Sequence, residues 1–343
     1  MSRCLATSRV EHRHMELRPL GRTGLQVSVL GFGCGSIGGL MVRGDPAEQR
    51  RAVELAIDGG VCYFDTAPSY GDGRSEENLG RVLAELGAKA ADVLVGTKVR
   101  LDPALAGDTA GAARAIRESL EASLRRLRRE RVQLVQLHNR ITVAGGDGGL
   151  TPEQVLGPVA EGLLAVRRAG LAEHIGITAT GDPGAVRRVI EAGIAETAQV
   201  FFNVLHPSAG WPGYADPGGP DYSGLIDLAA ARGIGVLVIR PLAAGALAAS
   251  DVRHPNAGPP GGITGERYED DLARARRLQA LAAELGLEGP VELALRFALS
   301  KAGVSTVLVG FSDAAQLGEA LRWVERGPLP AGVIERILAL RGA

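Results

Sequence analysis

The sequence has few cysteines, no long apolar run and no excess of either charge. Its three cysteines are too scattered for a disulfide framework, and no Cys-x-x-Cys or paired Cys/His spacing suggests a zinc site. No apolar run approaches the ~20 residues that a membrane span needs. Lys and Arg number 38 against 39 Asp and Glu, so the basic excess typical of nucleic-acid binders is missing. We therefore expect a cytoplasmic protein without a metal, membrane or nucleic-acid partner.

Glycine is abundant instead, at 48 of 343 residues, but it is not periodic, which excludes a collagen-like chain. A hydrophobic content of 45% with a net charge of −1 excludes disorder of the whole chain. No linker-like break interrupts residues 29–310. We expect residues 1–14 to be a disordered extension and residues 15–343 to form a single domain, whose oligomeric state the composition does not indicate.

Short apolar runs alternate regularly with longer amphipathic segments. The first helix carries a clear start signal, because Asp45 can cap its N-terminus and Pro46 suits its first position. Eight strands alternating with eight helices predict an α/β fold, the (β/α)8 TIM barrel. The predicted strands are 29–35, 61–65, 92–98, 132–138, 173–178, 198–202, 234–240 and 304–310, and the predicted helices are 45–60, 74–86, 109–129, 152–169, 182–192, 221–232, 266–285 and 313–325.

Several segments lie outside this alternation. Two extended pieces around a glycine turn, residues 17–28, predict an N-terminal hairpin that plugs the barrel, and two extra helices are predicted near the C-terminus, at 291–300 and 331–341. Two loops rich in Gly and Pro, 203–220 and 241–265, follow strands and so belong to the end of the barrel where active sites lie. Each is either a substrate lid or an ordinary flexible insertion.

A Gly-x-Gly-x-x-Gly pattern at residues 33–38 imitates a dinucleotide-binding site of the Rossmann type. In that fold the helix begins at the glycines, so that its N-terminus meets the pyrophosphate. Here the helix signals come later, at Asp45 and Pro46, and the acidic Asp65 follows Gly33 at a greater distance than the ~20 residues of the fingerprint. We therefore reject the Rossmann interpretation.

Four polar residues stand at or just beyond the ends of successive predicted strands: Asp65, Tyr70, Lys98 and His138. In a barrel these ends converge on one mouth. A lysine cation beside Tyr70 would lower the pKa of its hydroxyl, which could then exchange a proton with a carbonyl or alcohol oxygen that His138 orients. Such proton transfer accompanies hydride transfer, for which a cofactor is needed.

These residues carry a resemblance to the aldo-keto reductase superfamily over roughly residues 16–325. The segment YFDTAPSYGDGRSEENLGRVL is its most specific part, and GTK, QLVQLHN and GITAT follow in order. By this likeness Asp65, Tyr70, Lys98 and His138 are the catalytic tetrad, with Tyr70 as general acid/base. The resemblance implies reduction of aldehydes and ketones, or oxidation of alcohols including sugars, with NADP(H) or NAD(H) and without metal.

The same resemblance carries cofactor positions onto this chain. Thr178 and Gln199 match contacts to the nicotinamide carboxamide, and Phe202 matches the aromatic that stacks on the ring, although on the residues alone a core aromatic is nearly as good an interpretation. The segments 240–247 and 310–321 resemble the pyrophosphate and adenosine loops. Their matching residues are Arg240, Pro241, Leu242 and Gly245, and Gly310, Ser312, Gln316 and Glu319.

The preference between the two cofactors depends on arginine. The Arg that many NADP-dependent members place in the last segment is missing, and Ala320 replaces a frequent Asn. Another Arg would have to recognise the 2′-phosphate, and Arg253 and Arg267 are candidates. We favour NADP(H), with NAD(H) as a possible cofactor.

The sequence is compatible with two kinds of substrate pocket. Segments 73–80 and 310–321 are most similar to the branch of bacterial aldose 1-dehydrogenases and potassium-channel β-subunit-like reductases. A sugar substrate predicts a polar pocket with Asn139, Arg140 and His206, whereas an aromatic lid predicts an apolar one with Trp211 and Tyr214.

Two functions other than catalysis are a cofactor-binding subunit and a nucleic-acid-binding protein. The alternative to an enzyme is a non-catalytic cofactor-binding partner or regulatory subunit, although pure binding does not need Tyr70 and Lys98 together. The arginine-rich segment 113–132 has leucines at helical spacing and glutamates on its basic face. We interpret it as an outer helix of the barrel rather than a nucleic-acid surface.

Overall fold

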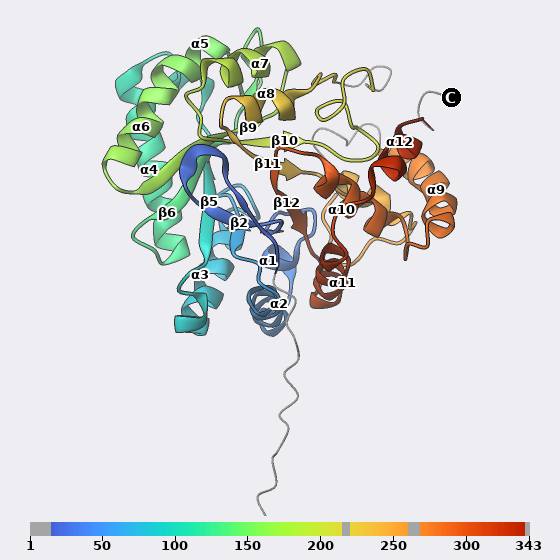
Figure 1. Ribbon diagram of the computed structural model, residues 1–343. Coiled ribbons are helices and arrows are strands. Elements are labelled where there is room, and N and C mark those ends of the chain that lie inside the picture. Colours follow the sequence, from blue (N-terminus) through green and yellow to red (C-terminus); the bar gives the residue numbers. More distant parts are fainter. Residues whose placement is uncertain (1–14, 215–219, 260–267, 340–343) are drawn as a thin grey trace, which may run out of the picture.

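Eight parallel strands close into a barrel in the computed structural model, which describes residues 15–214, 220–259 and 268–339 (Figure 1). The strands follow one another around the ring in chain order, and the last pairs with the first. The predicted TIM barrel is therefore confirmed. The strands are β3 (Leu30–Gly33), β4 (Tyr63–Asp65), β5 (Leu94–Val99), β6 (Val132–Leu137), β9 (Ala172–Ala179), β10 (Thr197–Phe201), β11 (Gly235–Ile239) and β12 (Val304–Gly310).

Helices surround this barrel, and most begin and end within a few residues of the predicted bounds (Figure 1). The Asp45 carboxylate caps the first long helix by accepting from the N–H groups of Ala47 and Glu48. The helices are α1 (Leu40–Arg43), α2 (Pro46–Asp58), α3 (Arg74–Leu86), α4 (Thr109–Leu127), α5 (Pro152–Gln154), α6 (Ala160–Arg168), α7 (Pro183–Ala192), α8 (Leu225–Ala231), α9 (Tyr268–Glu284) and α11 (Ala314–Glu325), with the two predicted extra helices α10 (Pro290–Ser300) and α12 (Ala331–Ala339).

Two predicted helices differ from the structure. The helix predicted over 152–169 is divided by a π-helical turn, Val155–Val159, because Pro158 lacks an N–H and its ring displaces the preceding turn. The helix predicted from residue 221 begins only at Leu225, after Ser223 and Gly224 in the left-handed region at φ 38° and 72°.

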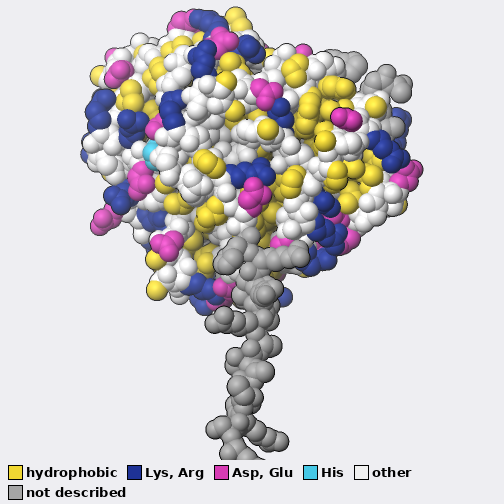
Figure 2. Space-filling view, in the orientation of Figure 1, with side chains coloured by type: hydrophobic (Ala, Val, Ile, Leu, Met, Phe, Trp, Pro, Cys, Tyr) yellow, Lys and Arg dark blue, Asp and Glu magenta, His cyan; other side chains and the backbone are white. Residues whose placement is uncertain are grey.

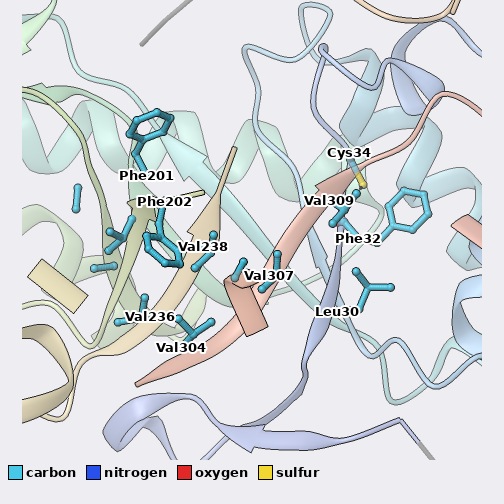
Figure 3. Packing of buried hydrophobic residues seen from close by; sticks show 14 of the residues in the cluster. Leu30, Phe32, Cys34, Phe201, Phe202, Val236, Val238, Val304, Val307 and Val309 are labelled. Carbon is cyan, nitrogen blue, oxygen red and sulfur yellow. Dashed lines mark hydrogen bonds between the residues drawn. The ribbon is translucent and has the colours of Figure 1, made fainter. Parts of the chain in front are cut away.

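Two apolar layers lie on opposite faces of the strands. Val236 and Val238 point toward the helices in the main core, part of which Figure 3 shows, whereas Leu237 between them points into the barrel. This alternation follows from the pleat of a strand, which sends successive side chains to opposite faces. The inner layer consists of Leu20, Val27, Tyr63, Leu134, Leu237 and Leu308.

The N-terminal hairpin supplies two members of that inner layer. Its strands, β1 (Leu17–Pro19) and β2 (Gln26–Ser28), pair antiparallel, and Leu20 and Val27 are fully buried. Arg22 fastens the turn by donating to the carbonyl oxygens of Gly193 and Ala195 at 2.6 and 2.8 Å. The predicted plug is confirmed, and it closes the end of the barrel opposite to the strands' carboxyl ends.

The surface shows how the charges are distributed. Basic and acidic side chains are interspersed on the face drawn in Figure 2, with apolar side chains between them. In α4 the residues Ile116, Leu120, Leu124 and Leu127 are buried, and Arg117 pairs with Glu121, as expected of an outer helix. In the described part of the chain no helix is both long and apolar enough to cross a bilayer.

Candidate active site

The carboxyl ends of β4, β5 and β6 bring the four predicted residues together at the barrel mouth. Lys98 is fully buried, and its ammonium donates to the Asp65 carboxylate, to the Thr66 carbonyl oxygen at 2.8 Å and to the Tyr70 hydroxyl at 3.2 Å. The His138 ring stands edge-on to the Tyr70 ring, with 5.8 Å between the ring centres. The buried lysine thus contacts a tyrosine that lies beside a histidine.

Asp65 fixes the lysine through a network of its own. Its second oxygen accepts from Gln199 Nε2 at 2.6 Å and from the Tyr63 hydroxyl at 3.4 Å. Burial alone would lower the pKa of Lys98, but the neighbouring Asp65 carboxylate and Tyr70 hydroxyl raise it above its ordinary value. Lys98 therefore stays charged at neutral pH.

The pKa of Tyr70 moves in the direction opposite to the prediction. Lys98 lowers it, as expected, but burial of the phenol has the larger effect and leaves the pKa above its ordinary value. The sequence does not show the depth of the barrel mouth, so only the lysine effect was predictable from it. Burial and the Lys98 cation lower the pKa of His138 to about 3, so this ring is neutral at physiological pH.

Three of the four residues, Asp65, Tyr70 and His138, line a cavity of about 1220 Å³. The cavity has two sides, because the strands that carry its lining occupy opposite sides of the barrel. Residues that follow β11, β12 and β3 line the first side, and residues that follow β5, β6 and β9 line the second side. Asp65, Tyr70 and His138 open into the space between. We name the first side the long arm and the second side the short arm.

Comparisons with known proteins show what this arrangement belongs to. The family model "Aldo/keto reductase family" matches residues 29–341. The chain belongs to the aldo/keto reductase family. Members of this family are oxidoreductases that reduce carbonyl compounds with NAD(P)H, and NADPH is their usual cofactor.

Individual relatives are similar over most of their length. An L-galactose dehydrogenase of Arabidopsis thaliana is 29% identical, over 89% of this chain and 86% of the relative. A probable voltage-gated potassium channel subunit beta of Oryza sativa is 26% identical, over 95% and 96%. The structure of an aldo-keto reductase from Bacillus halodurans in its holo form covers 95% of this chain and 96% of its own, with a TM-score of 0.70 and 26% identity.

Several features of this aldo/keto reductase fit a nicotinamide cofactor in the cavity. Thr178 and Gln199 both line the cavity, and Thr178 Oγ1 is buried without a hydrogen-bond partner among the described residues. An unpaired buried hydroxyl is costly, and a carboxamide in the cavity would satisfy it. The Gln199 side chain donates to Asp65, which leaves its oxygen as an acceptor.

The backbone after β11 also fits a bound group. Arg240, Ala243, Ala244 and Gly245 all have positive φ, between 46° and 99°. Non-glycine residues in this region cost roughly 1–3 kcal/mol each and cluster at ligand sites. The predicted Arg240, Pro241, Leu242 and Gly245 line the cavity here, and Gly310, Ser312, Gln316 and Glu319 line it beyond β12.

Arg253 reaches the same arm, in the described part of the loop predicted over 241–265. Its guanidinium donates to Ala244 O at 3.2 Å, Tyr268 Oη at 2.8 Å and Gly258 O at 2.6 Å. Arginine has five N–H donors, so two remain for a phosphate. Arg267, the other predicted candidate, lies outside the described residues.

Two predicted aromatic contacts are not brought to the cavity. Phe202 is fully buried and stacks on Phe297 of α10, with 5.6 Å between ring centres, and it belongs to the core drawn in Figure 3. Phe202 lies three residues after Gln199, so the pleat turns it to the helix side, and it cannot stack on a ring in the mouth. Trp211 packs on Phe202 and Phe297. The interpretation of Phe202 as a core aromatic fits this packing.

Three of the predicted substrate residues are also engaged elsewhere. Tyr214 packs against the main core, and His206 Nε2 lies 3.0 and 3.1 Å from the two oxygens of Asp271. Asn139 is fully buried and bonds to both backbone groups of Leu101. None of the three lines the cavity, whereas Arg140 does.

Sequence reasoning missed several lining residues. Residues 33–38 of the rejected pattern, except the buried Cys34, line the long arm, and Gly38 packs against the backbone at Gly310. Arg100, Thr180, Asp182 and Tyr222 line the short arm. Arg100 could have been found, because it follows Lys98 by two residues and therefore shares its face.

Among the described residues no group of three or more His, Cys, Asp or Glu could hold a metal ion.

Proposed function

We propose that this chain interconverts a carbonyl compound and an alcohol with NAD(P)(H), and that Tyr70 is the general acid/base. The observation that carries this proposal is the Lys98 ammonium, which bonds to Asp65 and to the Tyr70 hydroxyl at the edge of the cavity. A binding module has no need of a buried cation held against a phenol.

Each of the four residues has a task in this reaction. In the reducing direction the Tyr70 hydroxyl donates its proton to the carbonyl oxygen, and Lys98 stabilises the phenolate that forms. Asp65 keeps Lys98 in place, and neutral His138 donates a ring N–H to the same oxygen. The nicotinamide, when bound, supplies or accepts the hydride. In the oxidising direction Tyr70 accepts the proton of the alcohol.

The cofactor that we propose is NADP(H), with NAD(H) as the competitor. The two remaining donors of Arg253 in the long arm support a contact to the 2′-phosphate. Thr178 and Gln199 would hold the carboxamide, and the strained segment 240–245 would lie against the pyrophosphate.

A second candidate function is a cofactor-binding partner or regulatory subunit, which the relative named as a potassium channel subunit beta favours. The test is a fluorescence titration of the protein with NADPH and NADH, followed by turnover of a panel of aldehydes and alcohols. Saturable binding with turnover supports the enzyme. Saturable binding without turnover of any compound favours the partner subunit, and no binding of either cofactor by folded protein contradicts both.

A further inference from the structure

Two arginines repeat one pattern on neighbouring strands of the short arm. Arg100 follows Lys98 by two residues, and Arg140 follows His138 by two residues. Arg100 directly follows β5, and Arg140 begins the short strand β7 (Arg140–Ile141), which comes after β6. Both arginines line the same cavity as Tyr70 and His138. Two exposed cations therefore lie beyond the ends of the strands that position Lys98 and His138.

Neither guanidinium is neutralised by a described residue. No hydrogen bond or ion pair joins Arg100 or Arg140 to any residue in 15–214, 220–259 or 268–339. The acidic residue of this arm is Asp182, and one of its oxygens accepts the N–H of Val143 at 2.8 Å. By contrast, Arg253 in the long arm uses three donors within the protein.

Arg100 is also held in position. The fully buried Asn139 bonds to the N–H and C=O of Leu101, at 2.9 and 2.8 Å, and donates to Gly148 O at 2.9 Å. Gly148 packs so closely on the guanidinium that a Cβ there would lie 2.5 Å from Arg100 Nη2. Asn139, which the sequence suggested as a substrate contact, is thus a positioning residue for Arg100.

We propose that Arg100 and Arg140 bind an anionic group of the substrate, a carboxylate or a phosphate ester, separated by a few bonds from the carbonyl carbon that reacts. This proposal rests on the proposed function. A guanidinium presents paired donors that match either anion, and two unpaired cations in a partly enclosed cavity attract such a substrate before it docks. His138, whose ring lies beside Tyr70, is neutral and does not compete for the anion.

The first experiment compares substrates that differ only in charge. We would measure kcat/KM for 4-carboxybenzaldehyde and for its neutral methyl ester, and in a second arm for glyceraldehyde 3-phosphate and glyceraldehyde. We expect a preference for the anion of about tenfold or more in at least one arm, and the arm with the larger ratio identifies carboxylate or phosphate. Equal values in both arms would overturn the proposal.

The second experiment assigns the preference to the two arginines. Arg100→Gln and Arg140→Gln should each reduce the anion-to-neutral ratio about tenfold, through KM rather than kcat, and raising the salt concentration should reduce it further. Arg114→Gln is the matched control, because it removes one positive charge from exposed α4, away from the mouth. A ratio that falls equally in all three variants would mean a general effect of net charge and would contradict the proposal.

A binding measurement separates this inference from the proposed function. Calorimetry with 4-(hydroxymethyl)benzoate and its methyl ester, with NADPH or without cofactor, gives affinities for pairs that cannot react. Tighter binding of the anion that Arg100→Gln weakens supports the site even if no aldehyde is turned over. Turnover of neutral aldehydes without any preference for anions would leave the proposed function intact and remove this inference.

Discussion

The two ends of the barrel are built from the same eight strands and differ in almost every physical respect. At the amino end, Leu20 and Val27 of the hairpin close an apolar layer, and Arg22 is bonded to backbone carbonyl oxygens. At the carboxyl end, Lys98 is buried among polar groups, and positive φ angles follow β11. Close packing stabilises the amino end, whereas the carboxyl end keeps buried charge and backbone strain of the kind that clusters at ligand sites.

Replacing Lys98, near the carboxyl end of β5, should have the largest effect, and Lys89, in the turn before β5, offers a matched control. Lys98→Met would leave the Asp65 carboxylate buried and unpaired, so we expect a loss of about 3–5 kcal/mol in the free energy of unfolding. Turnover should fall at least about a hundredfold. Lys89→Met is the control, since Lys89 is at the amino end in an exposed ion pair with Glu54 and Asp58. Chemical denaturation and steady-state kinetics measure both, and equal losses in the two variants would contradict the comparison.

At the amino end of the barrel, a substitution in the inner apolar layer should lower the stability and leave the turnover unchanged. Leu20→Ala removes a fully buried side chain from the inner layer, and we expect unfolding to become about 2–5 kcal/mol easier. At a temperature where the variant stays folded, kcat should be unchanged. Leu105→Ala, at an exposed site, should have little effect on either quantity. A large loss of kcat in folded Leu20→Ala would show that the two ends are coupled.

Replacing Arg253 in the long arm should have a smaller effect, on the affinity for NADPH. Arg253→Gln should weaken NADPH binding about tenfold and leave NADH binding nearly unchanged, because only NADPH carries the 2′-phosphate. Fluorescence titration measures both affinities. The control is Tyr268→Phe, which removes one partner of Arg253 but keeps its charge. If both cofactors weaken equally, Arg253 supports the loop rather than the phosphate.

The pH dependence is the smallest effect and follows from the two shifted pKa values. Reduction needs a protonated Tyr70, whose pKa is raised above its ordinary value, and His138 stays neutral above about pH 3. The rate of reduction should therefore be level from about pH 5 to pH 9 and fall only as the pH rises through the Tyr70 pKa. Alcohol oxidation needs the phenolate and should rise with pH over the same range. A fall in reduction near pH 6.5 would show that His138 titrates normally.

Most of the fold could be predicted from periodicity, because each element carries its own signal. Asp45 and Pro46 mark a helix start through local hydrogen bonding, and the apolar run of β11 marks a strand buried on both faces. The π-helical turn at Pro158 and the late start of α8 were missed. Both depend on backbone geometry in a single turn, which average helical periodicity does not resolve.

The site was predictable where a residue ends a strand or belongs to a motif shared with the family, and unreliable where a loop residue was chosen by type alone. Asp65, Lys98 and His138 needed only the rule that strand ends converge. His206 and Trp211 were assigned by residue type. In the structure His206 contacts Asp271, and Trp211 packs on Phe297. For Phe202 the sequence left two interpretations, a cofactor contact and a core aromatic, and counting in twos from Gln199 favours the core.

The most direct test of the account compares two tyrosines near Asp65. Tyr70 faces the cavity and bonds to Lys98, whereas Tyr63 belongs to the inner apolar layer and reaches Asp65 at 3.4 Å. We would measure hydride transfer from NADPH to an aldehyde in a single turnover, for Tyr70→Phe and Tyr63→Phe, beside NADPH affinity. We expect Tyr70→Phe to lower the rate of hydride transfer about a thousandfold with unchanged NADPH affinity. We expect Tyr63→Phe to lower this rate less than about tenfold. Equal rates in the two variants would contradict the assignment of Tyr70 as the general acid/base.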